Sequence, residues 1–399
     1  MRPELMDLAL WQRVTGDENR ELLDAARRTD PKDPAALARL RKRWDAPLVV
    51  IALELTTARQ RAAMKFPDPH RLVADVQGVE QATSLRVAQH KARRFAEAVV
   101  QPGAPEIVDL CCGIGGDTMA LANVAQVTAV DANPVRAWMA QTNAACRAEV
   151  ADVLQYPLSG QLFHLDPDRR AARDRKTEKR TWRYAQYQPG PAYIERLLAD
   201  CPHGAVKLGP GVDFDALPLT PRTEIELVND AGTLVQTVLW CGNLAHHPGL
   251  RTATRLPEGL SFSDQPGIPL ATGQPDRLQH LLVADPAIER AQLLGALCRE
   301  LPVWEIHPGL GLLGAEEHVS SPWLTGYEII ARMPWRLGKI RQWLRTHGGG
   351  IVEVKTRGRA VETDAAQREL RGDGDVVFTV FGLRLGRRVV ALIGRKSAR

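Results

Sequence analysis

EIVDLCCGIGGDTMALANVAQVTAVDAN, residues 106–133, is the stretch that decides the fold of this chain. The apolar run at 106–110 predicts a short buried strand, and the glycine-bearing turn CCGIGG follows it. A helix is expected to begin near Asp117, and a second apolar strand over 127–130 ends in Asp131. Strand, glycine turn, helix and strand together form half of a βαβ unit of the kind that binds a nucleoside.

The residues of the turn indicate what kind of ligand it can accept. Gly113 and Gly115 let the backbone approach a ligand with no Cβ in the way, and the helix start offers free N–H groups. Asp131 can accept two hydrogen bonds from a ribose diol. A dinucleotide-binding turn needs a third glycine where this chain has Thr118, and Asp117 at the helix start would repel a pyrophosphate.

A phosphate-free ligand with an amino group fits these residues better than a dinucleotide does. Asp109, just before the turn, is a second carboxylate that is well placed for a cation. S-adenosylmethionine has these properties, so we expect it to be the cofactor, with Asp109, Asp117 and Asp131 among the residues that bind it. A plain tight turn without a ligand is the alternative, and a nicotinamide cofactor is a more distant one.

The composition narrows the class of protein. The chain has 399 residues, of which 44% are hydrophobic, so two or three domains with full cores are expected. It shows no apolar run of membrane-spanning length and no signal-peptide pattern, which predicts a cytoplasmic protein without a membrane segment. The six cysteines, and His246 and His247 near Cys241, lack metal-ligand spacing, so no metal site is predicted.

The hydrophobic pattern divides the chain into three regions. Residues 1–100 have apolar spacings of three and four and predict a helical region, in which Asp33 before Pro34 marks a helix start. Residues 101–273 alternate strands and helices and predict an α/β sheet that ends in an antiparallel pair. Residues 274–399 predict a small α+β module.

A helix expected from Thr83 or Ser84 to about Val99 carries both an apolar stripe and basic side chains. The predicted stripe consists of Leu85, Ala88, Ala92, Phe95 and Val99, and the basic residues Arg86, His90, Lys91, Arg93 and Arg94 are expected on the other faces. A solvated helix surface and a functional one are equally compatible with that basic face.

Carboxylates recur where the predicted parallel strands end. Asp109, Asp131, Asp152 and Asp166 all fall at such ends, the last within the apolar and then acidic run QLFHLDP. Ligands bind outside the carboxyl ends of the strands in open α/β sheets. Packing does not explain the recurrence, because buried carboxylates are costly without partners.

HLDPDRR, residues 164–170, is where we place the reaction. A carboxylate at Asp166 can accept a hydrogen bond from an incoming amino group and align its lone pair with the methyl group of the cofactor, or take its proton. Because that methyl group is already activated, orientation and desolvation could supply most of the rate. The alternative is that Asp166 merely caps the following turn.

The segment behind this motif is strongly basic. Between Arg169 and Arg183 there are eight Lys or Arg residues and two acids, with aromatic residues at the far end. Basic side chains beside aromatics suit a phosphate backbone with unpaired bases, so RNA is the expected partner, although a charge run is often a solvated helix. The predicted substrate-binding residues are Arg169, Arg170, Lys176 and Trp182.

Three motifs in order, DLCCGIGGDTMALA, AVDANPVRAWMAQTNAA and FHLDP, resemble those of class I S-adenosylmethionine-dependent methyltransferases. With the upstream QGVEQATSLRVAQHKARRF, they are most similar to the trimethylguanosine synthase-like subgroup. TGYEIIARMPWRLGKIRQWL and IVEVKTRG resemble a THUMP-like domain, a type associated with RNA binding. The resemblance implies an α/β, Rossmann-like methyltransferase sheet with an N-terminal helical region and a C-terminal α+β THUMP-like domain.

The resemblance also implies roles for single residues. Asp109, Gly113 and Gly115 would line the methionine end of the cofactor, and Asp152 would bind its adenine amino group. Thr83 falls where the family places a threonine near the cofactor.

The acceptor motif departs from the family pattern. Amino-group methylases of this family have Asp, Asn or Ser, then two prolines and a stacking aromatic, whereas this chain has Asp166-Pro167-Asp168-Arg169. Arg169 and Arg170 instead suggest binding of a phosphate or another anion. The expected function is RNA methylation, with a non-catalytic RNA-binding protein and a methyltransferase for a small anionic metabolite as alternatives.

Overall fold

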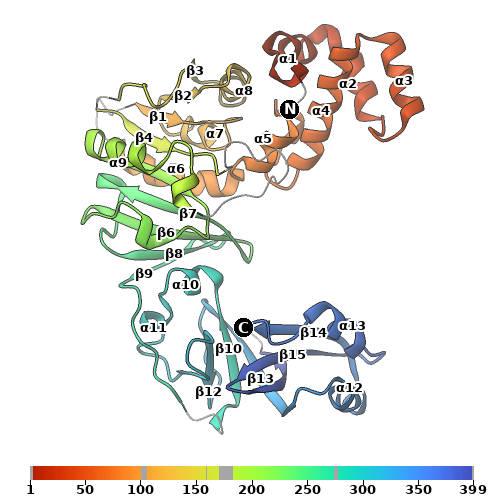
Figure 1. Ribbon diagram of the computed structural model, residues 1–399, viewed down its shortest axis with the longest axis vertical. Coiled ribbons are helices and arrows are strands. Elements are labelled where there is room, and N and C mark those ends of the chain that lie inside the picture. Colours follow the sequence, from red (N-terminus) through yellow and green to blue (C-terminus); the bar gives the residue numbers. More distant parts are fainter. Residues whose placement is uncertain (1–2, 100–105, 159, 170–182, 274–276, 398–399) are drawn as a thin grey trace. The chain divides into compact units, whose positions relative to one another are not determined.

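The computed structural model describes residues 3–99, 106–158, 160–169, 183–273 and 277–397. It divides into two compact units, Met1–Ser261 and Phe262–Arg399, which we describe separately (Figure 1). The N-terminal helices and the α/β sheet both lie in the first unit. Within the described residues, no helix combines the length and apolarity needed to cross a membrane.

The first unit begins with helices. They are α1 (Leu8–Thr15), α2 (Arg20–Arg27), α3 (Pro34–Arg43), α4 (Ala46–Ala62), α5 (Val76–Gln81) and α6 (Leu85–Ala98). Asp33 caps α3 by accepting a hydrogen bond from the Ala35 N–H at 2.9 Å, with Pro34 in the first turn, as the sequence predicts. Helix α4 is the centre of this bundle, because Ile51 and Leu55 are fully buried beside Trp11.

A nine-stranded sheet follows, with the strand order β3-β2-β1-β4-β5-β7-β6-β8-β9. Its strands are β1 (Ile107–Leu110), β2 (Val127–Asp131), β3 (Arg147–Val150), β4 (Leu162–Leu165), β5 (Gly204–Leu208), β6 (Thr223–Asp230), β7 (Thr233–Cys241), β8 (Arg251–Leu256) and β9 (Leu260–Asp264). The first five strands are parallel, and Leu110 of β1 lies level with Val130 of β2 and Leu165 of β4. The chain segments that leave β1, β2 and β4 therefore meet at one edge of the sheet.

Helices α7 (Thr118–Leu121), α8 (Pro134–Ala144) and α9 (Pro191–Asp200) connect the parallel strands. The Asn133 side chain caps α8 by accepting a hydrogen bond from the Val135 N–H at 2.9 Å. Helix α6 packs its apolar stripe on the sheet, where Phe95 is fully buried with Ile107 and Trp240. The predicted antiparallel pair is β6 and β7, which turn at Ala231 and Gly232.

The second unit contains a seven-stranded sheet with the order β11-β12-β10-β13-β16-β15-β14. Its elements are β10 (His280–Ala284), α10 (Pro286–Arg290), α11 (Leu294–Leu297), β11 (Trp304–Glu305), β12 (Leu312–Ala315), β13 (Leu324–Pro334), α12 (Leu337–Thr346), β14 (Gly349–Arg357), α13 (Thr363–Leu370), β15 (Val376–Leu385) and β16 (Arg388–Lys396). The run AIERAQLLGALCRE, residues 287–300, is predicted from its sequence to be one helix, but the structure has two short helices here, because Gln292 has a φ of +59° and breaks the helical path. Gly348, with a φ of +71°, follows the last turn of α12 and ends the helix.

Candidate functional site

A cavity of about 330 Å³ lies at the carboxyl ends of β1, β2 and β4. Several residues that the sequence singles out line it together: Thr83, Asp109, Gly113, Asp117, Asp131, Asp152, Asp166 and Arg169. Gly115 is not part of this lining. Arg170, Lys176 and Trp182 lie outside the described residues, so their predicted contacts with the substrate stay predictions.

The two glycines of the turn have different surroundings. Gly113 has a φ of +57°, and a Cβ placed on it would meet no atom within 4 Å, so it opens toward the cavity that it lines. Gly115 has a φ of +84°, and a Cβ there would lie 2.9 Å from the Cα of Ala140 in α8. Gly113 thus leaves space for a ligand, whereas Gly115 lets the turn pack against a helix.

Asp131 organises the turn from the end of β2. One carboxylate oxygen accepts a hydrogen bond from the Gly113 N–H at 3.0 Å, and the other accepts from the Asn133 N–H at 2.9 Å. Burial raises the pKa of this carboxyl group, although the two backbone donors oppose the shift. Because each carboxylate oxygen can accept more than one hydrogen bond, Asp131 can still bind hydroxyl groups in the cavity.

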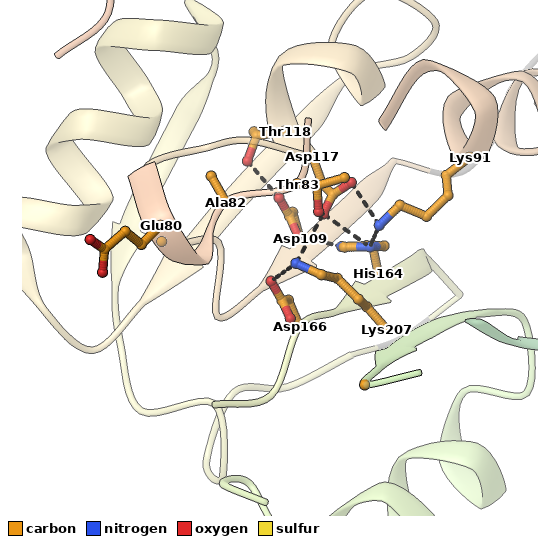
Figure 2. Close-up of polar contacts among 12 residues, drawn as sticks. Glu80, Ala82, Thr83, Lys91, Asp109, Asp117, Thr118, His164, Asp166 and Lys207 are labelled. Carbon is orange, nitrogen blue, oxygen red and sulfur yellow. Dashed lines mark hydrogen bonds and ion pairs between the residues drawn. The ribbon is translucent and has the colours of Figure 1, made fainter. Parts of the chain in front are cut away.

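Behind the cavity lies a buried network of charged and polar side chains (Figure 2). Asp109 accepts hydrogen bonds from Nδ1 of His164 at 2.8 Å and from the Thr118 hydroxyl at 2.5 Å. Nε2 of His164 lies 3.0 Å from Nζ of Lys91, which forms an ion pair of 2.7 Å with Asp117. Lys91 is only 1% exposed, so its expected place on a surface face of α6 is wrong.

Lys207 of β5 connects this buried network to Asp166 at the cavity. Its Nζ donates a hydrogen bond to Oδ2 of Asp166 at 2.5 Å and lies 4.0 Å from Oδ2 of Asp117. Figure 2 shows Lys207 between the two carboxylates. No described backbone N–H donates to the Asp166 side chain, which speaks against the interpretation of Asp166 as a turn cap. Its Oδ1 has no hydrogen-bond partner among the described residues.

The charged side chains of this network stabilise one another. Burial raises the pKa of the Asp117 carboxyl group, but the charges of Lys91 and Lys207 and the hydrogen bond with Lys91 outweigh burial, and the net shift is downward. Burial lowers the pKa of the Lys91 ammonium, and the charge of Asp117 partly opposes that shift. The Thr83 hydroxyl donates to Asp117 at 2.6 Å and so attaches the segment before α6 to the same carboxylate.

Three further basic residues of α6 pair with acids of the sheet. Arg86 contacts Asp230 at 2.7 Å, His90 contacts Glu226 at 2.7 Å, and Arg94 contacts Glu224 at 2.8 Å. Both glutamates are fully buried. The alternative of a solvated helix face therefore fails for His90 and Arg94, which fix α6 on the sheet and with it the position of the buried Lys91, whereas Arg86 and Arg93 are exposed.

Sequence reasoning missed three site residues, namely Lys91, His164 and Lys207. His164 and Lys207 each lie inside an apolar strand, and both are buried. A polar side chain in such a run is the signal that could have identified them, because a buried charge needs a partner.

The charged side chains that line the cavity fit a cationic nucleoside cofactor. Six aspartates line it, against three cationic side chains, Arg136, Arg169 and Lys207, counted over the described residues. An excess of carboxylates favours a ligand with a positive sulfonium and an ammonium group, and Gly113 provides open space beside them. The described residues contain no group of His, Cys, Asp and Glu that could hold a metal ion.

Comparisons with known proteins test the fold and the family of the chain. Residues 324–396 match the THUMP domain-like family, and residues 104–179 match the family described as RNA cap guanine-N2 methyltransferase. The chain also resembles a solved structure, a Porphyromonas gingivalis W83 protein provisionally assigned as a methyltransferase, with a TM-score of 0.70 and 17% identity over 100% of this chain and 99% of the other. The expected Rossmann-like methyltransferase fold with a THUMP-like domain is confirmed.

The family follows from closer relatives. The chain is 30% identical over 354 residues to an uncharacterised S-adenosylmethionine-dependent methyltransferase found in two strains of Mycobacterium tuberculosis, CDC 1551 / Oshkosh and H37Rv. This alignment covers 84% of the chain and 92% of each relative. With the cavity and its aspartates, it shows that the chain belongs to the S-adenosylmethionine-dependent methyltransferases, and its cofactor is S-adenosylmethionine.

Proposed function

We propose that this methyltransferase acts on RNA. The observation that carries the proposal is the presence, in one chain, of a methyltransferase cavity and a THUMP-like region at residues 324–396. The match of residues 104–179 to a family described by an RNA substrate supports the same class of acceptor. Trimethylguanosine synthase-like specificity is not part of this proposal, because the acceptor motif lacks the second proline and the aromatic residue of that pattern.

Asp166 is the residue that we assign to the acceptor. Its Oδ1 can accept a hydrogen bond from an N–H of an incoming amino group, while Lys207 holds Oδ2 at 2.5 Å. This arrangement orients the nitrogen lone pair toward the cavity. When bound, S-adenosylmethionine supplies an activated methyl group on a positively charged sulfur. As the carbon–nitrogen bond forms, the bond of the methyl carbon to sulfur breaks and its electron pair stays on the sulfur, and the proton that the nitrogen loses passes to Asp166 or to water.

Arg169 marks the acceptor side of the cavity. Its guanidinium packs over Gly209, since a Cβ on that glycine would lie 2.7 Å from Nη1 of Arg169. The Tyr187 hydroxyl accepts a hydrogen bond from the Gly209 N–H at 3.0 Å and belongs to the same wall. A guanidinium on the acceptor side of the cavity suits a phosphate group of the substrate.

The test is methyl transfer from labelled S-adenosylmethionine into total RNA from a strain that lacks this protein. The Asp166→Asn variant is the matched control, because an amide oxygen can still accept the hydrogen bond from Lys207 while the negative charge is lost. We expect label in RNA with the wild type and a loss of at least about 100-fold with the variant. Cofactor affinity, measured by calorimetry, should stay within about threefold of the wild type, because we place Asp166 on the acceptor.

The outcomes separate the candidate functions. If the label appears in a small anionic metabolite and not in RNA, the substrate is a small molecule and the proposal of an RNA substrate is wrong. RNA binding that weakens steeply with added salt, without any methyl transfer, would indicate a non-catalytic RNA-binding protein. Equal labelling by the wild type and Asp166→Asn would exclude the role of Asp166 while leaving RNA as the substrate.

A further inference from the structure

Arg136 has a buried donor that no described residue uses. It lies in the first turn of α8, lines the cavity and is 9% exposed. Its Nη2 donates a hydrogen bond to Oδ2 of Asp75 at 2.8 Å. Its Nη1 is buried and has no hydrogen-bond partner. A buried guanidinium N–H without an acceptor is unfavourable, so the arrangement indicates a ligand that supplies one.

Helix α5 holds Arg136 in this position. Asp75 caps α5 by accepting a hydrogen bond from the Gly78 N–H at 2.6 Å, and the same carboxylate binds Arg136. A Cβ on Gly78 would lie 1.9 Å from Nη1 of Arg136 and 2.3 Å from Cγ2 of Ile114 in the glycine turn. The guanidinium therefore lies in a slot between α5 and the turn, and the absence of a side chain at Gly78 makes room for it.

The charges around the cavity indicate which anion fits. Of the three cationic side chains in the described lining, Lys207 pairs with Asp166, and Arg169 lies on the acceptor side. Arg136 lies instead between α5 and the glycine turn. At Arg136, apart from Arg169 on the acceptor side, the aspartates of the lining disfavour a phosphate, whose charge is larger than that of a carboxylate. A single carboxylate on a ligand that also carries positive groups is compatible with them.

We propose that the guanidinium of Arg136 binds the carboxylate of the methionine part of S-adenosylmethionine. Arg136 is then a specificity residue that distinguishes the complete cofactor from analogues without this group. Asp75 is a positioning residue, because it acts through Arg136. The inference rests on the family of the protein and not on RNA as the substrate, so a failure of either proposal can be told from a failure of the other.

The test compares three ligands by isothermal titration calorimetry without RNA. S-adenosylmethionine has the carboxylate, decarboxylated S-adenosylmethionine lacks only that group, and methylthioadenosine lacks the whole amino-acid end. The wild type should bind S-adenosylmethionine about 10- to 100-fold more tightly than the decarboxylated form. Arg136→Gln should remove this preference by weakening S-adenosylmethionine alone, and leave the affinities for the other two ligands unchanged.

Two further variants guard against a folding defect and a general charge effect. The double variant Asp75→Asn with Arg136→Gln leaves no buried charge without a partner, and it should lose the same preference. Arg147→Gln removes an exposed arginine of β3 that does not line the cavity, and it should keep the preference. Circular dichroism checks that each variant is folded.

Three results would overturn the inference. The first is a wild type without preference for the carboxylate, which needs no variant at all. The second is an Arg136→Gln variant that binds all three ligands equally more weakly, which would indicate a structural role or a contact with the nucleoside. The third is an Arg136→Gln variant with unchanged affinity for S-adenosylmethionine. This result would overturn the inference even if methyl transfer to RNA fell.

Discussion

Replacing Lys91 by methionine removes the cation that neutralises Asp117 behind the cofactor cavity. Lys91 is 1% exposed and Asp117 is 6% exposed, so neither charge is solvated. Methionine keeps most of the aliphatic volume of lysine, so the change tests the charge more than the packing. We expect the first unit to lose stability because a buried carboxylate is left with incomplete compensation.

The magnitude follows from what remains around Asp117. Removal of one partner from a buried ion pair typically costs about 3–5 kcal/mol. Asp117 keeps the hydrogen bond from Thr83 at 2.6 Å, and Lys207 stays 4.0 Å away. These partners favour the lower end of the range, about 3 kcal/mol. The double variant Lys91→Met with Asp117→Asn should regain at least about 1 kcal/mol, because the uncompensated charge is gone.

Native-state hydrogen exchange is the appropriate assay, because a chain with two units need not unfold in one transition. Peptides that cover β1 and β4 report the opening free energy next to Asp109 and His164. Peptides from the second unit provide the internal control and should not change. A loss below about 1 kcal/mol in β1 and β4, or a double variant no more stable than Lys91→Met, would refute the reasoning.

Three further predictions concern the acceptor, the pH dependence and the glycine turn. Lys207→Met should lower kcat about tenfold or more, with the calorimetric affinity for S-adenosylmethionine unchanged, because it holds Asp166. Burial raises the pKa of Glu226, but its contact with His90 and the charge of Arg94 outweigh burial and lower the pKa from 4.5 to about 2. The Glu226 carboxylate therefore stabilises the fold by about 3 kcal/mol above pH 4.5, and this contribution is lost as the pH falls toward 2. Glu226→Gln should flatten urea-derived stability over that range. Gly115→Ala should cost about 2 kcal/mol or more in urea denaturation, whereas Gly113→Ala should cost about 1 kcal/mol and mainly weaken cofactor binding in calorimetry.

Much of the cavity could be predicted from local sequence because of the geometry of parallel strands. Asp131 ends β2, and Asp166 follows β4 directly. Since these strands run in the same direction and in register on either side of β1, their ends meet at one place. A motif at the end of a strand therefore gives its position in space, once the strand order is that of an open α/β sheet.

The supporting charges could not be assigned in the same way, because their partners are distant in sequence. His164 lies 55 residues from Asp109, and Lys207 lies 41 residues from Asp166. The register of β1 and β4 places Asp109 level with His164, but that register becomes known only from the structure. The sequence shows that such side chains are buried in apolar strands, and not which charge compensates each of them.

Lys91 and Arg136 show what a stricter interpretation of helix periodicity can add. Lys91 follows Ala88 by three residues and precedes Phe95 by four, so it lies on the apolar stripe of α6 and not beside it. A lysine at that spacing requires a buried counter-charge, and Asp117, at the helix start after the glycine turn, supplies it. Arg136 lies in the first turn of the helix that follows Asp131 and is also buried, so its charge requires a partner too. Its partner Asp75 satisfies only Nη2, and the donor left over is what distinguishes a ligand-binding charge from a structural one.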